Sequence, residues 1–290
     1  MTKETNNYIL KISCPDKAGI IAAISNFLFK ADFNISESSQ FKDPKNSRFF
    51  MRVSFYSFSD KIKYGSVADL KNDFNEIANK FEMNFEFFDA KKKPRILIMV
   101  SKFGHCLNNL LYQWKIGSIS AEIPLIVSNH TDLEQFVMPY NLKYIHMPIT
   151  EKNKNEQENK LLCLIKKERI DLVVLARYMQ ILSPNFCKKL EGKIINIHHS
   201  FLPSFKGAKP YEQAFLKGVK IIGATAHYVT DKLDEGQIIE QDVARVDHTK
   251  LLKNFVSIGR DIESVVLSKA INWHLEHRII INENRTVVFN

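Results

Sequence analysis

Ile-Ile-Asn-Ile-His-His-Ser-Phe-Leu-Pro-Ser-Phe, residues 194–205, is an apolar strand pattern that runs directly into histidines, a serine and a proline. This pattern is typical of a buried parallel strand whose carboxyl end opens into a site, because ligands of open α/β sheets bind outside those ends. Asn196 and His198 are two residues apart, so a strand places both on one face. An amide donor and an imidazole at the end of a strand suit the polarisation of a carbonyl group.

A doubly wound α/β domain with a mostly parallel sheet is predicted around this stretch, because apolar runs alternate with helical patterns such as 156–167. The apolar runs are 95–100, 123–127, 142–145, 172–175 and 194–197. Two further strand-like runs, 221–229 and 237–246, are separated by a short turn and predict an antiparallel pair. A helix period then continues over 251–265 towards Trp273 and His274.

Residues 1–89 predict a separate small domain. Strand patterns and amphipathic helix patterns follow one another as strand, helix, strand, strand, helix, strand, which is the ferredoxin-like βαββαβ order. Asp16 is the expected N-cap of the first helix, and Ser66 with Asp69 forms a capping box for the second. Because 90–94 is Ala-Lys-Lys-Lys-Pro, we expect a linker there, and a second domain over 95–290.

Composition excludes several classes of protein. No apolar run approaches the roughly 18 residues of a membrane span, and no apolar export signal follows Met1, so we expect a cytoplasmic protein without membrane contact. The four cysteines are scattered, which disfavours a disulfide framework or a structural zinc site. The net charge of +9 invites a nucleic-acid partner, but acidic residues are interleaved with the lysines and favour an ordinary solvated surface.

Asn196, His198 and Asp234 are the candidate catalytic residues. Asn196 can donate to an oxygen that gains negative charge, His198 can move a proton near neutral pH, and Asp234 lies in a glycine-containing turn between two strands. Each also has an ordinary structural explanation, and we expect His199 to pack against its surroundings. A zinc site of His198, His199 and His227 is the alternative, but adjacent strand residues point to opposite faces.

The motifs from Asn196 to Gly207, Gly223 to Thr230 and Leu233 to Gly236 resemble the family of formyltransferase-fold enzymes that use 10-formyltetrahydrofolate. The resemblance implies that Asn196, His198 and Asp234 are catalytic. The segment 175–183 is similar to the folate-pocket loop of that family. The substrate-binding residues implied in this way are Met179, Gln180, Ile181, Leu182, Val229 and Thr230.

Other segments resemble 10-formyltetrahydrofolate deformylases. They are Ser101, His105 to Leu107, Ser128 to His130, Pro148 to Thr150, Lys152 to Lys154 and Glu156 to Glu158. The resemblance implies hydrolysis of 10-formyltetrahydrofolate to formate and tetrahydrofolate, with no cofactor and no metal. It also implies that the enzyme supplies formate for purine synthesis and balances one-carbon folate pools.

The stretch Ile12 to Ile35, with its Cys-Pro-Asp-Lys-Ala-Gly-Ile turn, resembles the ACT domain. This resemblance implies a regulatory domain that binds an amino-acid effector, glycine or methionine, and a homo-oligomer. Asp16, Gly19 and Asn34 are the implied effector-binding residues, although Asp16 and Gly19 also suit a helix cap and a turn.

Alternative functions stay open, of which two are formyltransferases. A formyltransferase would pass the formyl group to an amine such as glycinamide ribonucleotide, but the segment 101–107 has a single glycine where that enzyme family cradles a phosphate. A methionyl-tRNA formyltransferase would need a further tRNA-binding domain, for which no room follows residue 246. An inactive folate-binding or amino-acid-sensing protein is the other alternative, and the presence of all three polar residues speaks against it.

Overall fold

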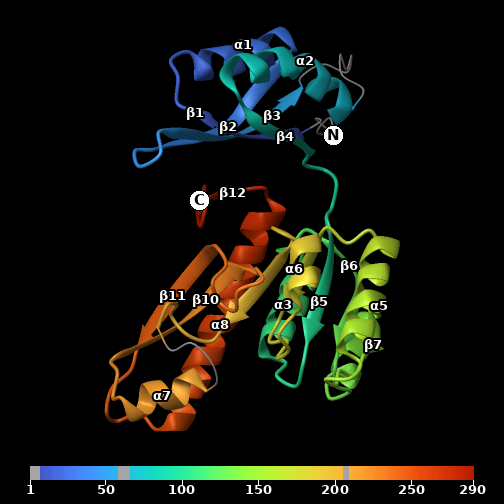
Figure 1. Cartoon of the computed structure of the whole chain (residues 1–290), viewed down its shortest axis with the longest axis vertical. Coiled ribbons are helices and arrows are strands. Elements are labelled where there is room, and N and C mark those ends of the chain that lie inside the picture. The colour runs from blue at the N-terminus through green and yellow to red at the C-terminus, as the bar shows by residue number, and fades with distance from the viewer. Residues whose placement is uncertain (1–6, 58–65, 205–208) are drawn as a thin grey trace. The chain divides into compact units, whose positions relative to one another are not determined.

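The computed structural model describes residues 7–57, 66–204 and 209–290 and contains two compact units (Figure 1). The first comprises Met1–Lys93, Glu276–Asn282 and Val287–Asn290, and the second comprises Pro94–Leu275 and Glu283–Thr286. The end of the formyltransferase-like motif, 205–207, lies outside the described residues.

The small unit has the predicted ferredoxin-like fold. Its elements are β1 (Asn7–Pro15), α1 (Ile20–Lys30), β2 (Phe33–Asp43), β3 (Arg48–Ser57), α2 (Val67–Phe81) and β4 (Asn84–Asp89). The strand order is β2-β3-β1-β4, and β1 pairs antiparallel with both β3 and β4. Both helices lie on one face of this sheet (Figure 1).

Alternation along the strands explains the core of the small unit. Leu10 and Ile12 of β1 and Val53 of β3 are buried on the side of the helices, where Phe74 of α2 contacts the rings of three other phenylalanines. The Ser66 hydroxyl accepts from the Asp69 N–H at 3.3 Å and caps α2 as expected. The predicted cap at Asp16 is wrong, because α1 begins at Ile20 after Gly19, which has a φ of 91°.

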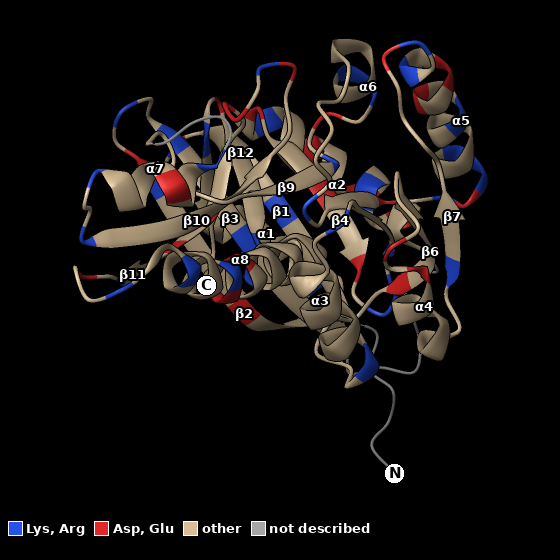
Figure 2. Cartoon of the chain, turned by 90° about the horizontal axis from the view of Figure 1, so that it is seen from below, with Lys and Arg blue, Asp and Glu red and all other residues tan. Residues whose placement is uncertain are grey.

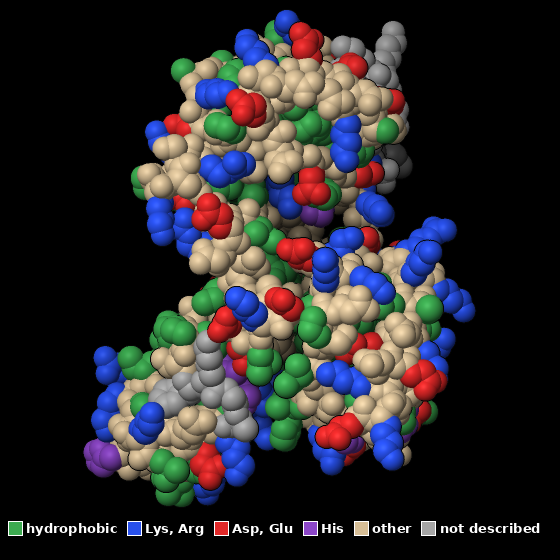
Figure 3. Space-filling view, in the orientation of Figure 1, with side chains coloured by type: hydrophobic (Ala, Val, Ile, Leu, Met, Phe, Trp, Pro, Cys, Tyr) green, Lys and Arg blue, Asp and Glu red, His purple; other side chains and the backbone are tan. Residues whose placement is uncertain are grey.

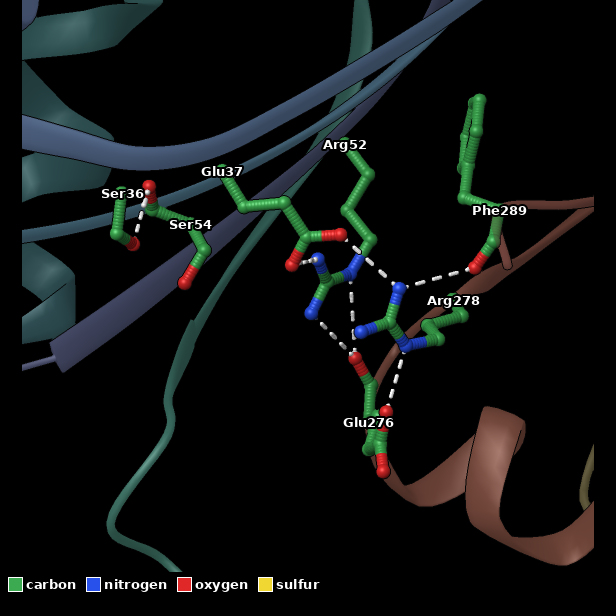
Figure 4. A network of polar contacts seen from close by, with 7 residues as sticks. All are labelled: Ser36, Glu37, Arg52, Ser54, Glu276, Arg278 and Phe289. Atoms are coloured by element: carbon green, nitrogen blue, oxygen red, sulfur yellow. Dashed lines mark hydrogen bonds and ion pairs between the residues drawn. The ribbon is translucent and has the colours of Figure 1, made fainter.

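The C-terminal residues do not follow the predicted division at 95–290. Arg52 of β3 is 4 % exposed and donates from Nε and Nη2 to the Glu276 carbonyl at 3.3 and 3.0 Å, and from Nη1 to Glu37 at 2.9 Å (Figure 4). Arg278 donates to the other oxygen of Glu37 at 3.0 Å and to the Phe289 carbonyl at 3.1 Å. These charge-assisted contacts tie the end of the chain into the small unit.

The large unit contains a seven-stranded, mostly parallel sheet of order β11-β10-β9-β8-β5-β6-β7. Its strands are β5 (Arg95–Val100), β6 (Glu122–Ser128), β7 (Lys143–His146), β8 (Leu172–Leu175), β9 (Ile194–His198), β10 (Ile221–Tyr228) and β11 (Ile238–Arg245). The strands β5 to β9 are parallel, whereas β10 runs antiparallel to both β9 and β11. The predicted doubly wound fold is confirmed.

Helices pack on both sides of this sheet. They are α3 (His105–Lys115), α4 (Glu134–Val137), the 3-10 helix η1 (Met138–Tyr140), α5 (Lys154–Lys167), α6 (Pro184–Lys189), α7 (Pro210–Leu216) and α8 (Leu252–Leu275). Leu161 and Ile165 of α5 share one core with Leu97, Val127 and other strand residues, whereas α8 packs against β9, β10, β11 and α3. A last strand pair, β12 (Ile279–Asn282) and β13 (Arg285–Val288), was not predicted.

The strand order reverses between β5 and β8, since β6 and β7 extend the sheet to one side and β9 to the other. The loops that follow β5 and β8 therefore lead to opposite sides of the sheet and leave a crevice between them. Open α/β sheets bind their ligands in this crevice. The fold topology thus predicts a ligand site near Ser101, the loop after Leu175 and the end of β9.

Basic and acidic residues are interleaved on the elements in Figure 2, and Figure 3 shows both signs mixed on the face in view. A search of the described residues finds no helix with the length and apolar character needed to cross a membrane.

We predict that Arg52→Met lowers the free energy of unfolding by about 2 kcal/mol, because it leaves the Glu276 carbonyl and one oxygen of Glu37 without their donor. Equilibrium urea denaturation followed by circular dichroism measures this change. Lys45→Met, at an exposed residue of the same unit, is the control. A loss no larger in Arg52→Met than in the control would contradict the anchoring of the C-terminal residues.

Candidate active site

Asn196 and His198 lie at the carboxyl end of β9, in the middle of the sheet. His198 is 4 % exposed and Asn196 is half-buried. The antiparallel register places His227 of β10 opposite Asn196 and Thr225 opposite His198. The pairing of β9 with β10 therefore brings the Asn196 amide and the imidazoles of His198 and His227 close together. The sequence analysis identified Asn196 and His198 as catalytic candidates.

The carboxylate of Asp234 lies between two imidazole rings. Its Oδ2 is 3.3 Å from Nδ1 of His198, and its Oδ1 is 3.8 Å from Nε2 of His227. Burial alone would raise the pKa of Asp234, but the interaction with His198, chiefly its hydrogen bond, outweighs it and lowers the pKa. Asp234 is therefore an ionised carboxylate at neutral pH, so it can accept a proton during a reaction.

The turn that carries Asp234 needs unusual backbone geometry. Asp234 has a φ of 55°, in the left-handed region that aspartate tolerates better than most residues. A Cβ at Gly236 would lie 1.7 Å from the carbonyl oxygen of Tyr228, so only glycine fits there. The sequence Asp-Glu-Gly thus lets the turn fold back onto the end of β10.

His227 lies between Asn196 of β9 and Asp234 of the turn after β10. Its Nδ1 is 2.7 Å from the Tyr228 carbonyl oxygen, which can only accept, so Nδ1 carries the hydrogen. Its Nε2 then accepts from the amide nitrogen of Asn196 at 3.2 Å. Burial lowers the pKa of His227, which keeps the ring neutral. Sequence reasoning missed this role because the register of β9 against β10 cannot be read from residue types.

The Nε2 atom of His198 is buried and has no hydrogen-bond partner among the described residues. Its Nδ1 faces Asp234, so Nε2 is the ring atom left for a substrate. A buried polar atom without a partner costs free energy unless a ligand satisfies it. The pair of Asn196 and His198 can therefore receive one small polar group.

His199 lies closer to His198 than strand alternation predicts. The two ring centroids are 5.2 Å apart, because β9 ends at His198 and alternation does not extend to His199. Burial, followed by the charge of Arg177, lowers the pKa of His199 to about 3. The described residues that could together hold a metal ion are His105, Cys106 and Glu263, and not the three histidines considered from the sequence.

The predicted folate loop is held at both ends. The Ser101 hydroxyl accepts from the Met179 N–H at 3.0 Å and donates to Asn129 at 2.6 Å. The buried Glu158 accepts from the Ser183 N–H at 2.9 Å. Three predicted substrate residues, Gln180, Ile181 and Leu182, line a small, mainly apolar pocket with a volume of about 10 Å³. Its other lining residues are Val127, Met147, Ile149, Lys154, Gln157, Glu158, Leu161 and Tyr178.

The remaining predicted substrate residues lie elsewhere. Met179 is 50 % exposed and is not part of the lining of this pocket. Val229 packs against the core, and its N–H donates to the Ile194 carbonyl at 2.9 Å. Thr230 follows it and donates to the Lys232 carbonyl at 3.2 Å, at the start of the turn that carries Asp234. These two residues therefore adjoin the catalytic candidates.

Comparison with known proteins gives one consistent result. A family described as formyl transferase matches residues 94–271. A formyltetrahydrofolate deformylase of Bacillus subtilis is 46% identical over 97% of this chain and 93% of that protein. The crystal structure of a formyltetrahydrofolate deformylase from Pseudomonas syringae pv. tomato superposes with a TM-score of 0.95 at 42% identity, covering 100% of this chain and 96% of that chain.

The chain belongs to the formyltetrahydrofolate deformylase family. A glycinamide ribonucleotide transformylase from Symbiobacterium toebii is also similar, with a TM-score of 0.65 and 27% identity. That likeness covers 98% of the transformylase and only 71% of this chain, whereas the deformylases match nearly all of it. The extent of the match thus distinguishes the deformylase family from the transformylase.

The predicted effector residues of this deformylase-family chain have partners of their own. Asp16 pairs with Lys42 at 2.6 Å, and its N–H donates to the Ser47 carbonyl. Gly19 caps α1, and the side-chain amide of Asn34 donates to the Tyr56 hydroxyl at 2.8 Å. Asp16 and Gly19 share one turn, whereas the contact of Asn34 lies between β2 and β3.

We predict that His199 makes the deformylase-family fold less stable in acid. The unfolded chain binds a proton at His199 below about pH 6.5 and the folded chain only near pH 3, so the unfolding free energy falls as pH drops through this window. The contribution is up to about 1.4 kcal/mol per pH unit. His199→Gln should remove this part of the slope in urea titrations between those pH values. Asn185→Gln, at an exposed residue that does not titrate, should leave the slope unchanged, and an unaltered slope in His199→Gln would contradict the prediction.

Proposed function

We propose that the chain hydrolyses 10-formyltetrahydrofolate to formate and tetrahydrofolate, the activity for which its relatives are named deformylases. The observation that carries the proposal is the Asp234 carboxylate between His198 and His227, beside His198 Nε2, which has no hydrogen-bond partner among the described residues. This arrangement supplies a proton acceptor and a place for one carbonyl oxygen.

Asn196 and His198 stabilise the oxyanion. One N–H of the Asn196 amide is directed to His227, which leaves the second for the formyl oxygen. His198 Nε2 shares this oxygen when it carries a proton. Donors fixed in this way favour the transition state, since no reorientation is needed as negative charge develops.

Asp234 acts on the attacking water. The water oxygen bonds to the formyl carbon, and the proton that it loses is taken up by the pair of Asp234 and His198. The tetrahedral intermediate collapses by breaking the bond from carbon to N10 of the folate, and the same proton passes to that nitrogen. The carbon leaves as formic acid, which gives its remaining proton to solvent and becomes formate, and tetrahydrofolate leaves with the site back at its starting charge.

The folate would lie against the loop 179–182 and the residues Val229 and Thr230. Support comes from the pocket lined by Gln180, Ile181 and Leu182, and from the position of Thr230 next to the turn of Asp234. No cofactor is needed for this reaction.

The small unit would serve as a regulator. We infer that Asp16, Gly19 and Asn34 bind a small amino acid, glycine or methionine, in a homo-oligomer in the cytoplasm, and that the formate supports purine synthesis. The ferredoxin-like order of the small unit and the turn at Asp16 and Gly19 support the inference. Passing the formyl group to an amine is the second candidate, favoured by the likeness to the transformylase.

We predict that Asn196→Ala and Asp234→Asn each lower turnover about a hundredfold or more, because one removes an oxyanion donor and the other the carboxylate beside His198. The measurement is formate release from 10-formyltetrahydrofolate in buffer without an amine. Asn185→Ala and Asp231→Asn, at exposed residues, are the matched controls. Release that requires glycinamide ribonucleotide would instead make the chain a transferase.

Glycine or methionine should change the rate of formate release, and Asp16→Ala with Asn34→Ala should abolish the change while leaving the basal rate intact. Steady-state rates with and without each amino acid measure this. Equal rates in all conditions would remove the regulatory role.

A further inference from the structure

A buried carboxylate that the proposed reaction does not use lies in the large unit. Glu263 of α8 is 1 % exposed. Its Oε1 accepts from the Tyr211 hydroxyl at 2.7 Å, and its Oε2 lies 2.8 Å from Nε2 of His105 and 3.3 Å from Nε of Arg177. The four side chains come from α8, α7, α3 and the loop after β8, so a single carboxylate joins four elements.

The charges of this cluster are fixed. Burial alone would raise the pKa of Glu263, but the hydrogen bond from His105 and the charge of Arg177 outweigh it and lower the pKa. Burial and the same carboxylate raise the pKa of Tyr211, which keeps its hydroxyl protonated as a donor. Glu263 is thus an anion whose two oxygens already have partners, and burial raises the pKa of the neighbouring Cys106 thiol. A metal ion would have to displace these contacts, so we assign none.

Gly259 makes the contact with Tyr211 possible. A Cβ at this residue would lie 2.1 Å from Cζ and 2.3 Å from the hydroxyl oxygen of Tyr211. Glycine inside a helix costs about 1 kcal/mol relative to alanine. Gly259 lies one helical turn before Glu263 in α8. The absence of a Cβ there leaves room for the Tyr211 ring beside the helix.

Arg177 connects the carboxylate to the folate loop. Its φ of 64° is in the left-handed region, which is unfavourable for a side chain with a Cβ. Its side chain is about nine-tenths buried, and its Nε makes no hydrogen bond with the described residues, so the attraction to Glu263 is one of charge. The Arg177 carbonyl accepts from the Ser101 N–H at 3.3 Å, and the Ser101 hydroxyl accepts from the N–H of Met179.

We propose that Glu263 is a positioning residue that fixes Arg177 and, through it, the backbone of the folate loop 179–182. Without the carboxylate, Arg177 would be a buried cation with no counter-charge, and it would leave its left-handed conformation to reach water. The loop begins two residues after Arg177, and the Met179 N–H would then lose its hydrogen bond to the Ser101 hydroxyl. This proposal rests on the proposed function, since it assigns the loop to folate binding.

The test compares Glu263→Gln, Arg177→Met and the double variant by steady-state formate release. Each single variant should raise KM about tenfold with kcat within about threefold, because the loop binds substrate and transition state alike. The double variant should raise KM no further than either single variant, because both changes break one link. Lys269→Ala, at an exposed residue of α8, should leave KM unchanged.

Several outcomes would overturn the proposal. The proposal fails if KM is unchanged in the single variants, or if kcat falls without a rise in KM. It also fails if the KM of the double variant rises about a hundredfold, the product of the two single effects. A merely structural role predicts lower thermal stability with normal KM, and thermal denaturation of each variant separates the two cases.

Two further measurements keep the test decisive. Should Glu263→Gln fail to fold, Arg177→Met breaks the same ion pair from its other end, and a normal KM in that variant would overturn the proposal. Binding of tetrahydrofolate by calorimetry does not need turnover. If the wild-type chain releases no formate but its tetrahydrofolate affinity falls in Glu263→Gln, the hydrolytic function fails and the positioning role stands.

Discussion

The Asp234 carboxylate between the rings of His198 and His227 is the interaction on which the site depends. It requires a strand that delivers His198 to the end of a parallel sheet and an antiparallel neighbour that places His227 beside it. It also requires a turn closed by Gly236 against the Tyr228 carbonyl. The neutral His227 in turn orients the Asn196 amide, so one carboxylate, two imidazoles and one amide form a single unit of charge and hydrogen bonding.

Different parts of the large unit carry the residues that we propose for substrate binding and for chemistry. The loop after β8 that we propose for folate binding is held by Ser101 and Glu158 and, in our proposal, by the ion pair of Arg177 with Glu263, whereas the proposed catalytic side chains come from β9, β10 and the turn after β10. Different elements therefore support the two tasks. The small unit is held together by its aromatic core and by Arg52, whose contact with the Glu276 carbonyl brings the end of the chain into that unit.

Periodicity allowed the strands and main helices to be predicted, because burial on one face imposes a period of 2 or 3.6 on the residues. It also predicted that Asn196 and His198 share a site, since both belong to one strand. It could not find His227 or Glu263, because their roles depend on register and on contacts between distant elements. The assignment of 276–290 to the second domain was wrong for most of that segment for the same reason: the contacts of Arg278 with Glu37 leave no periodic signal.

Water, activated beside Asp234, is the acceptor that we propose for the formyl group. The most direct measurement is a single turnover of 10-formyltetrahydrofolate in water enriched in oxygen-18, without any amine, followed by mass spectrometry of the formate. We expect one heavy oxygen in each formate formed by the wild-type chain and almost no formate from Asp234→Asn. Formate that appears only after an amine is added, or an equal yield from Asp234→Asn, would contradict it.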